Sequence, residues 1–260
     1  MKSGSSDNGE GLSPSDCALL LHLGHYHLTF REALTATLFK DGKDPGNALA
    51  ALARQGYLKD KAAPSKKKKA KAPADEEPLK FPGGKRYYIL GPKGASLLGL
   101  PKERTYFPKP AAMYSNLAVL WHCTMEANRS YRLSGKEVRE LFPKKPPHHN
   151  TIHCITDEDA APVVYRAYVS ASEAKAILKE AKRLIVAALE NSSLRPFVVN
   201  GEYGLALLVE TAQKRDRLRE MLQNPPKRQA GLAEMARIKV EIGPSPQTLN
   251  IALRSLKKSE

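Results

Sequence analysis

Long apolar runs and cysteine pairs are missing from this sequence of 260 residues. No stretch approaches the roughly 20 apolar residues that a membrane-spanning helix requires, and residues 1–14 are polar and rich in glycine and serine, unlike a signal peptide. The three cysteines, Cys17, Cys123 and Cys154, are too few and too scattered for a disulfide framework. We therefore expect a disordered tail over residues 1–14, no membrane partner and a reducing, cytoplasmic location.

Motifs of nucleotide and metal chemistry are also missing. Gly83–Lys85 and Gly91–Gly94 are glycine-rich but lack the spacing of a phosphate-binding Walker loop. Histidines and a cysteine gather in one short segment, at His148, His149, His153 and Cys154. Because there is no Cys-x-x-Cys pair, this cluster is better interpreted as a basic loop before a half-buried strand than as a zinc site. We expect no metal and no cofactor.

Acidic residues are outnumbered, since 27 Asp and Glu stand against 42 Lys and Arg and leave a net charge of +15. Residues 63–86 alone hold eight basic and three acidic residues and so supply +5 of that excess. Such a balance favours a polyanionic partner, because each phosphate that a protein neutralises releases condensed counterions. The alternative is that the charge serves solubility alone.

Helix and strand signals follow one another closely between residues 15 and 100. A first helix is predicted at Ser15–Gly24, with Ser15 as N-cap and Gly24 as its end. Thr29 and Glu32 form a capping-box pattern for a second helix, Phe30–Phe39. The other predicted elements are a short strand at Tyr26–Leu28, a turn at Asp41–Asp44, a helix that begins at Pro45 and stops at Gly56, and strands at Tyr57–Lys61 and Lys85–Leu90.

This order of elements is typical of a winged helix-turn-helix domain, here over residues 15–100 with a flexible basic wing tip at residues 62–84. In such domains the recognition helix meets base edges, and Asn47 and Arg54 are the side chains suited to do so. Phosphate contacts are expected from the basic residues Lys66, Lys67, Lys68, Lys69, Lys71, Lys85 and Arg86. The alternatives are a solvated helix face and a low-complexity linker. Duplex DNA is the predicted partner.

The second half of the sequence has a different order of predicted helices and strands. Residues 101–110 are rich in proline and are the expected linker, and residues 111–260 form the second domain. Helices are predicted at Ala111–Ala127, Gly135–Leu141 (capped by Ser134), Ser172–Glu190 (capped by Ser170), Ala212–Leu222 (capped by Thr211) and after Ser245. Strands are predicted at Asn150–Thr156, Pro162–Val169, Tyr203–Glu210 and Arg237–Ile242. The alternation predicts an α+β protein whose second domain has a small mixed sheet.

The block at residues 15–100 and the stretch GLALLVETAQKRDRLREML at Gly204–Leu222 resemble the replication-relaxation family of bacterial plasmid and mobile-element proteins. The resemblance implies an N-terminal winged helix followed by an αβ domain related to restriction endonucleases. It also implies a DNA-binding role in replication, relaxation or transcriptional regulation. The basic helix start at Lys214–Arg219 is either a second phosphate-binding face or a solvated one.

The sequence departs from a nuclease of that fold at the residues that would hold a metal. Such enzymes need carboxylates on two neighbouring strands, and Val163–Tyr168 has none. Asp157, Glu158 and Asp159 lie in the turn that we expect before this strand. We therefore predict a protein that is not an enzyme, with an αβ domain that forms a homodimer or holds a protein partner. The alternatives are a metal-dependent nuclease or nickase that uses these acids, and a protein-interaction module that binds no DNA.

Overall fold

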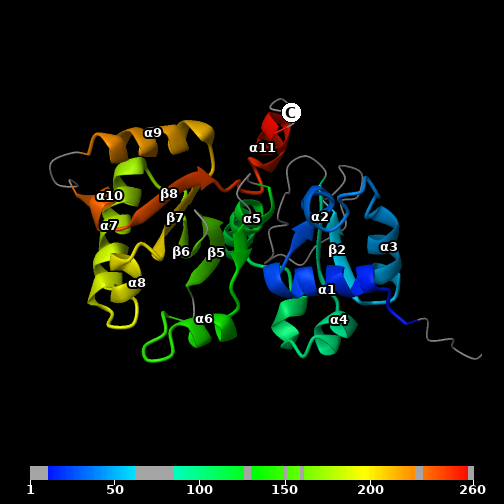
Figure 1. The fold of residues 1–260 in the computed structure, drawn as a ribbon. Helices are drawn as coiled ribbons and strands as arrows, with labels where there is room; N and C mark the ends of the chain where they lie inside the picture. Colours follow the sequence, from blue (N-terminus) through cyan, green and yellow to red (C-terminus); the bar gives the residue numbers. More distant parts are fainter. Residues whose placement is uncertain are drawn as a thin grey trace, which may run out of the picture.

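A computed structural model describes residues 11–62, 85–125, 130–148, 151–158, 161–225 and 231–256. These residues form a mixed α+β protein with two sheets (Figure 1). No helix in the described ranges has the length and apolar character that crossing a bilayer would require. Of the tail expected at residues 1–14, residues 1–10 lie outside the described ranges. Of the wing tip expected at residues 62–84, residues 63–84 lie outside them.

The first half is built around a three-stranded antiparallel sheet with the strand order β1-β3-β2. Its elements in chain order are α1 (Pro14–Tyr26), β1 (Thr29–Phe30), α2 (Arg31–Thr37), α3 (Gly46–Arg54), β2 (Leu58–Ala62), β3 (Arg86–Leu90), α4 (Pro92–Leu97) and the 3-10 helix η2 (Lys102–Thr105). The predicted helix after Pro45 and both predicted strands of the hairpin are confirmed. Leucines of α1, α2 and α3 and residues of the hairpin close a small core beneath this sheet.

Helix α1 differs from the prediction at both ends. Its N-cap is Ser13, whose hydroxyl accepts a hydrogen bond from the Asp16 amide at 3.1 Å, and Pro14 occupies the first turn. The helix also continues past Gly24 to Tyr26. A Cβ atom at Gly24 would lie 2.8 Å from Leu98 Cδ1. Gly24 therefore serves close packing against the segment after α4, and the predictions of Ser15 as N-cap and Gly24 as helix end are wrong.

Thr29 is not the cap of the second helix. It lies in β1, fully buried, and its hydroxyl is 3.1 Å from Nε2 of His22. Helix α2 begins at Arg31 with no side-chain cap. The Thr29 hydroxyl thus contacts α1 and does not cap α2, although the capping-box pattern predicted that it would. The predicted strand at Tyr26–Leu28 is also wrong in position, because the strand lies at Thr29–Phe30.

The second half is built around a five-stranded mixed sheet with the order β4-β5-β6-β7-β8. Strands β4, β5 and β6 are antiparallel neighbours, and β6, β7 and β8 run parallel. The strands are β4 (Ser130–Arg132), β5 (Ile152–Glu158), β6 (Ala161–Val169), β7 (Tyr203–Val209) and β8 (Arg237–Ile242). The helices are α5 (Pro110–Thr124), α6 (Gly135–Leu141), α7 (Ala174–Glu190), α8 (Arg195–Val199), α9 (Ala212–Gln223), α10 (Leu232–Met235) and α11 (Leu249–Leu256).

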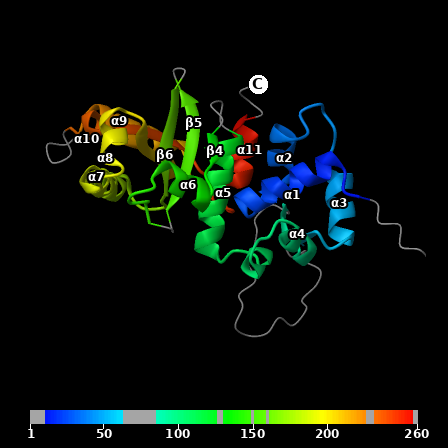
Figure 2. The same cartoon turned by 60° about the horizontal axis from the view of Figure 1, so that its bottom comes forward.

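Helices cover both faces of the larger sheet. In Figures 1 and 2, α5 and α11 lie on the face turned toward the first half, and α7, α8 and α9 lie on the opposite face. Strand β7 is buried along its whole length, as its unbroken apolar sequence predicts. Ser134 and Thr211 are confirmed as N-caps of α6 and α9, whereas α7 begins after Glu173 with no side-chain cap, so Ser170 is not one.

One hydrophobic cluster joins the two halves. Tyr26, Phe30 and Tyr87 of the first half are buried together with Leu117 and Trp121 of α5. The same cluster extends to the face of the larger sheet through Cys154, Tyr165 and Leu208. Residues on both sides of the expected linker thus share a core, and α5 lies between the larger sheet and helix α1 of the first half (Figure 2).

Candidate nucleic-acid interface

Helix α3 is held in place from one side only. Leu49 and Leu52 are buried in the small core of the first half. At its start, the carboxylate of Asp44 accepts a hydrogen bond from the Gly46 amide at 2.9 Å and pairs with Arg31 at 2.8 Å. The helix lies at the end of the molecule remote from the larger sheet, in both views (Figures 1 and 2). No described residue therefore covers the outer face of α3, where Asn47, Ala50 and Arg54 are exposed.

Asn47 and Arg54 lie on that outer face and are exposed. They are seven residues apart, which places them on the same side of the helix, with exposed Ala50 between them. Neither side chain is hydrogen-bonded or ion-paired to another residue of the described ranges. The structure thus brings together the two predicted base-reading residues on a surface with small side chains between them.

Lys85 and Arg86, at the start of β3, have acidic partners. Lys85 pairs closely with Glu32 of α2, and both side chains are less than one-third exposed. Arg86 pairs with Asp60 of β2 at 3.6 Å across the hairpin, where both side chains are solvent-exposed. An exposed pair of this kind contributes little to stability and exchanges readily for another anion. Arg86 is accordingly better placed than Lys85 for a phosphate.

The five lysines of the predicted wing tip, Lys66, Lys67, Lys68, Lys69 and Lys71, lie outside the described residues. The strands on either side of them are paired in register, with Ala62 opposite Arg86. The segment therefore leaves and re-enters the structure at one end of a hairpin.

The acids of the nuclease alternative are not where the sequence predicts them. Strand β5 extends through Glu158, so Asp157 and Glu158 belong to the strand and not to a turn, and Asp159 lies outside the described residues. The antiparallel pairing with β6 continues to Glu158, which lies opposite Ala161, and this pairing explains why the strand is longer than predicted. Glu158 pairs closely with Lys239, lies 3.3 Å from Arg237 and accepts a hydrogen bond from the Tyr165 hydroxyl at 2.9 Å.

These partners decide the charge state of Glu158. Burial favours a raised pKa, but the hydrogen bonds from Lys239 and Tyr165 and the two positive charges outweigh it and leave the pKa of Glu158 below its usual range. The carboxylate is ionised and already neutralised by two cations, which would repel a divalent metal ion.

The histidine and cysteine cluster is divided by the sheet. His153 and Cys154 are neighbours on β5, so their side chains point to opposite faces. His153 is buried with Nε2 3.1 Å from the Tyr203 hydroxyl, whereas Cys154 Sγ lies 3.6 Å from Cys123 Sγ on the other face. No group of three or more His, Cys, Asp or Glu side chains suited to a metal ion occurs within the described residues, and His149 is not among them.

The basic start of α9 is engaged with the protein itself. Lys214 donates to the Ala171 carbonyl at 2.7 Å, and Arg219 donates to the Val240 carbonyl at 2.8 Å. Arg215 and Arg217 form ion pairs with Asp216 and Glu220. The sequence left a phosphate-binding face and a solvated face as alternatives, and the structure instead shows these side chains in hydrogen bonds and ion pairs within the protein.

A separate group of cations, which the sequence does not single out, lines a cavity between the two halves. Arg104, Arg132 and Arg139 contribute to it from η2, β4 and α6. They are too far apart along the chain to form a motif, and only the packing of the halves brings them together. No local sequence signal could have identified them.

Comparison of the chain with protein-family models, with curated proteins and with solved structures found no match.

Proposed function

We propose that the protein binds duplex DNA through residues 15–100, which act as a winged helix-turn-helix domain. The observation that carries this proposal is the element order α1-β1-α2-α3-β2-β3 combined with the strand order β1-β3-β2. In a domain of this kind the third helix enters the major groove and the hairpin between the last two strands lies against the backbone. The exposed outer face of α3 supports that placement.

Each predicted residue then has a distinct role. Asn47 is suited to adenine and Arg54 to guanine, because each can form a bidentate hydrogen bond to the base edge in the major groove. The lysine run Lys66–Lys69, with Lys71, contacts phosphates and adds affinity without reading sequence. Arg86 joins them by exchanging Asp60 for a phosphate, and Lys85 contributes less because Glu32 holds it.

The second half in this proposal is not a nuclease but the part that forms a homodimer or binds a protein partner. The cations around Glu158 support the absence of metal-dependent cleavage. The resemblance to replication-relaxation proteins supports the proposal that the protein serves a plasmid or other mobile element in the bacterial cytoplasm. The process served is its replication, its relaxation or its transcriptional regulation.

Fluorescence anisotropy with labelled duplex and single-stranded DNA at two salt concentrations tests the proposal. We expect duplex binding that weakens steeply with salt. Arg54→Ala should weaken binding to a selected duplex site by about tenfold, since one bidentate base contact contributes about 1–3 kcal/mol. Lys175→Ala is the matched control, because it removes one exposed positive charge from α7 on the far side of the larger sheet. A flat titration with the wild-type protein would contradict DNA binding and favour a protein-interaction module.

A further inference from the structure

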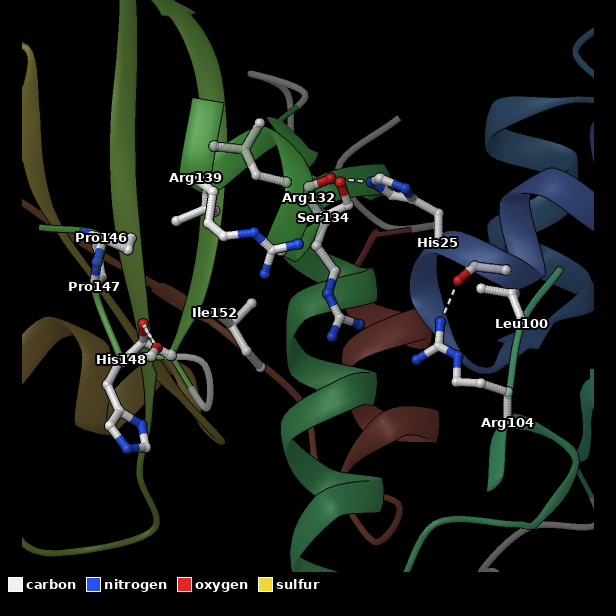
Figure 3. Close-up of a pocket in the computed structure, with 15 residues that line it drawn as sticks. His25, Leu100, Arg104, Arg132, Ser134, Arg139, Pro146, Pro147, His148 and Ile152 are labelled. Atoms are coloured by element: carbon white, nitrogen blue, oxygen red, sulfur yellow. Dashed lines mark hydrogen bonds between the residues drawn. The ribbon is translucent and has the colours of Figure 1, made fainter. Parts of the chain in front are cut away.

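A cavity of about 590 Å³ lies between the two halves, away from α3. One wall comes from the end of α1 and from η2, with Gly24, His25 and Arg104. The opposite wall comes from β4, α6 and the segment before β5, with Arg132, Arg139 and His148. Figure 3 shows the guanidinium groups of Arg139, Arg132 and Arg104 one after another across this space. Its volume is in the range of small-molecule binding sites.

Two of the three arginines, Arg104 and Arg132, are held by hydrogen bonds to the protein that leave other donors unused. Arg104 donates from Nη2 to the Gly24 carbonyl, while its Nε is buried and has no partner in the described part of the chain. Arg132 donates from Nη1 to the carbonyl of Tyr26 and to Oδ1 of Asn116, both at 3.3 Å. Arg139 has no ion pair with a described residue. A guanidinium group has five N–H donors, and these hydrogen bonds use only Nη2 of Arg104 and Nη1 of Arg132, so each of these two residues keeps a further amino group for an anion.

Among the described residues, no carboxylate lines the cavity to balance these charges. The negative charge of Glu137 raises the pKa of His25, which lines the cavity. The carboxylate of Glu137 itself accepts a hydrogen bond from the Ser134 amide at 2.6 Å, in the capping box of α6. Burial, followed by the charge of Arg132, lowers the pKa of Arg104 to about 10. Burial, the charge of Arg104 and the charge of Arg132 together lower the pKa of His27 to about 4. The cations thus repel one another across a partly desolvated space.

Six apolar side chains share the lining with the polar groups of Ser134 and Thr151. Leu100, Leu133, Val138, Pro146, Pro147 and Ile152 face the same cavity. A ligand that satisfies both parts of the lining carries a multiply charged anionic group and a flat or apolar body. Phosphate fits the charged part, because its oxygens accept paired hydrogen bonds from one guanidinium group and it carries more than one negative charge.

We propose that this cavity binds a nucleotide, with its phosphates between Arg104, Arg132 and Arg139 and its base against the apolar wall. The phosphate can come from a free nucleotide or from the 5′ end of a nucleic-acid strand. The inference is independent of DNA binding through α3, because none of the lining residues belongs to α3, β2 or β3.

Isothermal titration calorimetry on the full-length protein tests the proposal with ADP, adenosine and inorganic phosphate as probes. We expect ADP to bind, adenosine to bind at least tenfold more weakly, and ADP to raise the melting temperature. Arg139→Gln should weaken ADP binding by about tenfold, the effect of removing one charge-assisted hydrogen bond. Lys136→Gln is the matched control, since it removes a positive charge from the same helix but outside the cavity lining.

A second pair of probes separates the two sources of phosphate. The same oligonucleotide is titrated with a 5′-phosphate and with a 5′-hydroxyl. Tighter binding of the phosphorylated strand that Arg139→Gln abolishes would support the cavity as a site for strand ends. The proposal is overturned if neither ADP nor the 5′-phosphate produces a binding signal that depends on Arg139, or if Arg139→Gln and Lys136→Gln behave alike.

Discussion

Nε2 of His153 on β5 lies 3.1 Å from the hydroxyl of Tyr203 on β7, so a hydrogen bond between two buried side chains spans the intervening strand β6. The other ring nitrogen of His153, Nδ1, is buried without a hydrogen-bond partner in the described residues. A second proton on this ring would have no acceptor. Burial, followed by the positive charge of Arg166, accordingly lowers the pKa of His153 from 6.5 to about 4.

This pair predicts a loss of stability in mild acid. Between pH 6.5 and 4, His153 is protonated in the unfolded chain but neutral in the folded protein. Its contribution to the free energy of unfolding is therefore complete above pH 6.5 and is lost as the pH falls toward 4. His22 has its pKa lowered to about 4 by burial and then by His25, and it acts in the same direction. The expected loss is about 2–3 kcal/mol per histidine.

Urea unfolding of the wild type and of His153→Gln between pH 7 and pH 4 measures the effect. The free energy of unfolding should depend less on pH in His153→Gln than in the wild type. His122 acts in the opposite direction, because its hydrogen bond with Glu241 outweighs burial and raises its pKa. Equal slopes in the wild type and His153→Gln would contradict the assignment.

Gly94→Ala is expected to destabilise the first half. A Cβ atom at this position would lie 2.4 Å from the backbone carbonyl oxygen of Tyr57, which cannot move without shifting the start of β2. Overpacking of this kind costs about 1–3 kcal/mol. Gly135→Ala is the control, because its nearest contact is the flexible end of Arg139 at 3.7 Å. Thermal unfolding should show a lower midpoint for Gly94→Ala only.

Replacing Lys66, Lys67, Lys68 and Lys69 with alanine should weaken binding to every duplex alike. The slope of log affinity against log salt concentration should become shallower by about 0.9 for each phosphate that the protein no longer neutralises. The melting temperature should stay the same, because lysines in a low-complexity segment bury little. Unchanged affinity and salt slope would show that the run is a linker.

Supercoiled DNA incubated with the protein and magnesium or manganese should stay intact. Metal-dependent hydrolysis needs carboxylates held against the scissile phosphate, and Glu158 is neutralised by Lys239 and Arg237. Cleavage that Asp157→Ala or Asp159→Ala abolishes would promote the nuclease alternative. Glu158→Gln is informative as well, since loss of stability without any change in DNA integrity is the expected result.

The sequence predicted correctly those elements that are determined by residues close together in the chain. The Ser134–Glu137 capping box and the apolar strand β7 are examples, because their signals lie within a few residues. Predictions were wrong where a distant partner decides the outcome, as for Thr29, which His22 engages, and Gly24, which packs against Leu98. The outer residues of α3 follow from helical spacing, whereas the arginines of the cavity come from three unrelated segments and have no signature in the sequence.

The cluster that joins Phe30 and Tyr87 to α5 makes the two sheets parts of one cooperative unit. Separating the chain at the proline-rich segment would expose this apolar surface on both fragments, so each would aggregate or unfold where the intact protein does not. Calorimetry of the whole chain should then give a single transition. A ligand bound at either end would raise the melting temperature of both halves together, since neither half can unfold without uncovering the layer that it shares with the other.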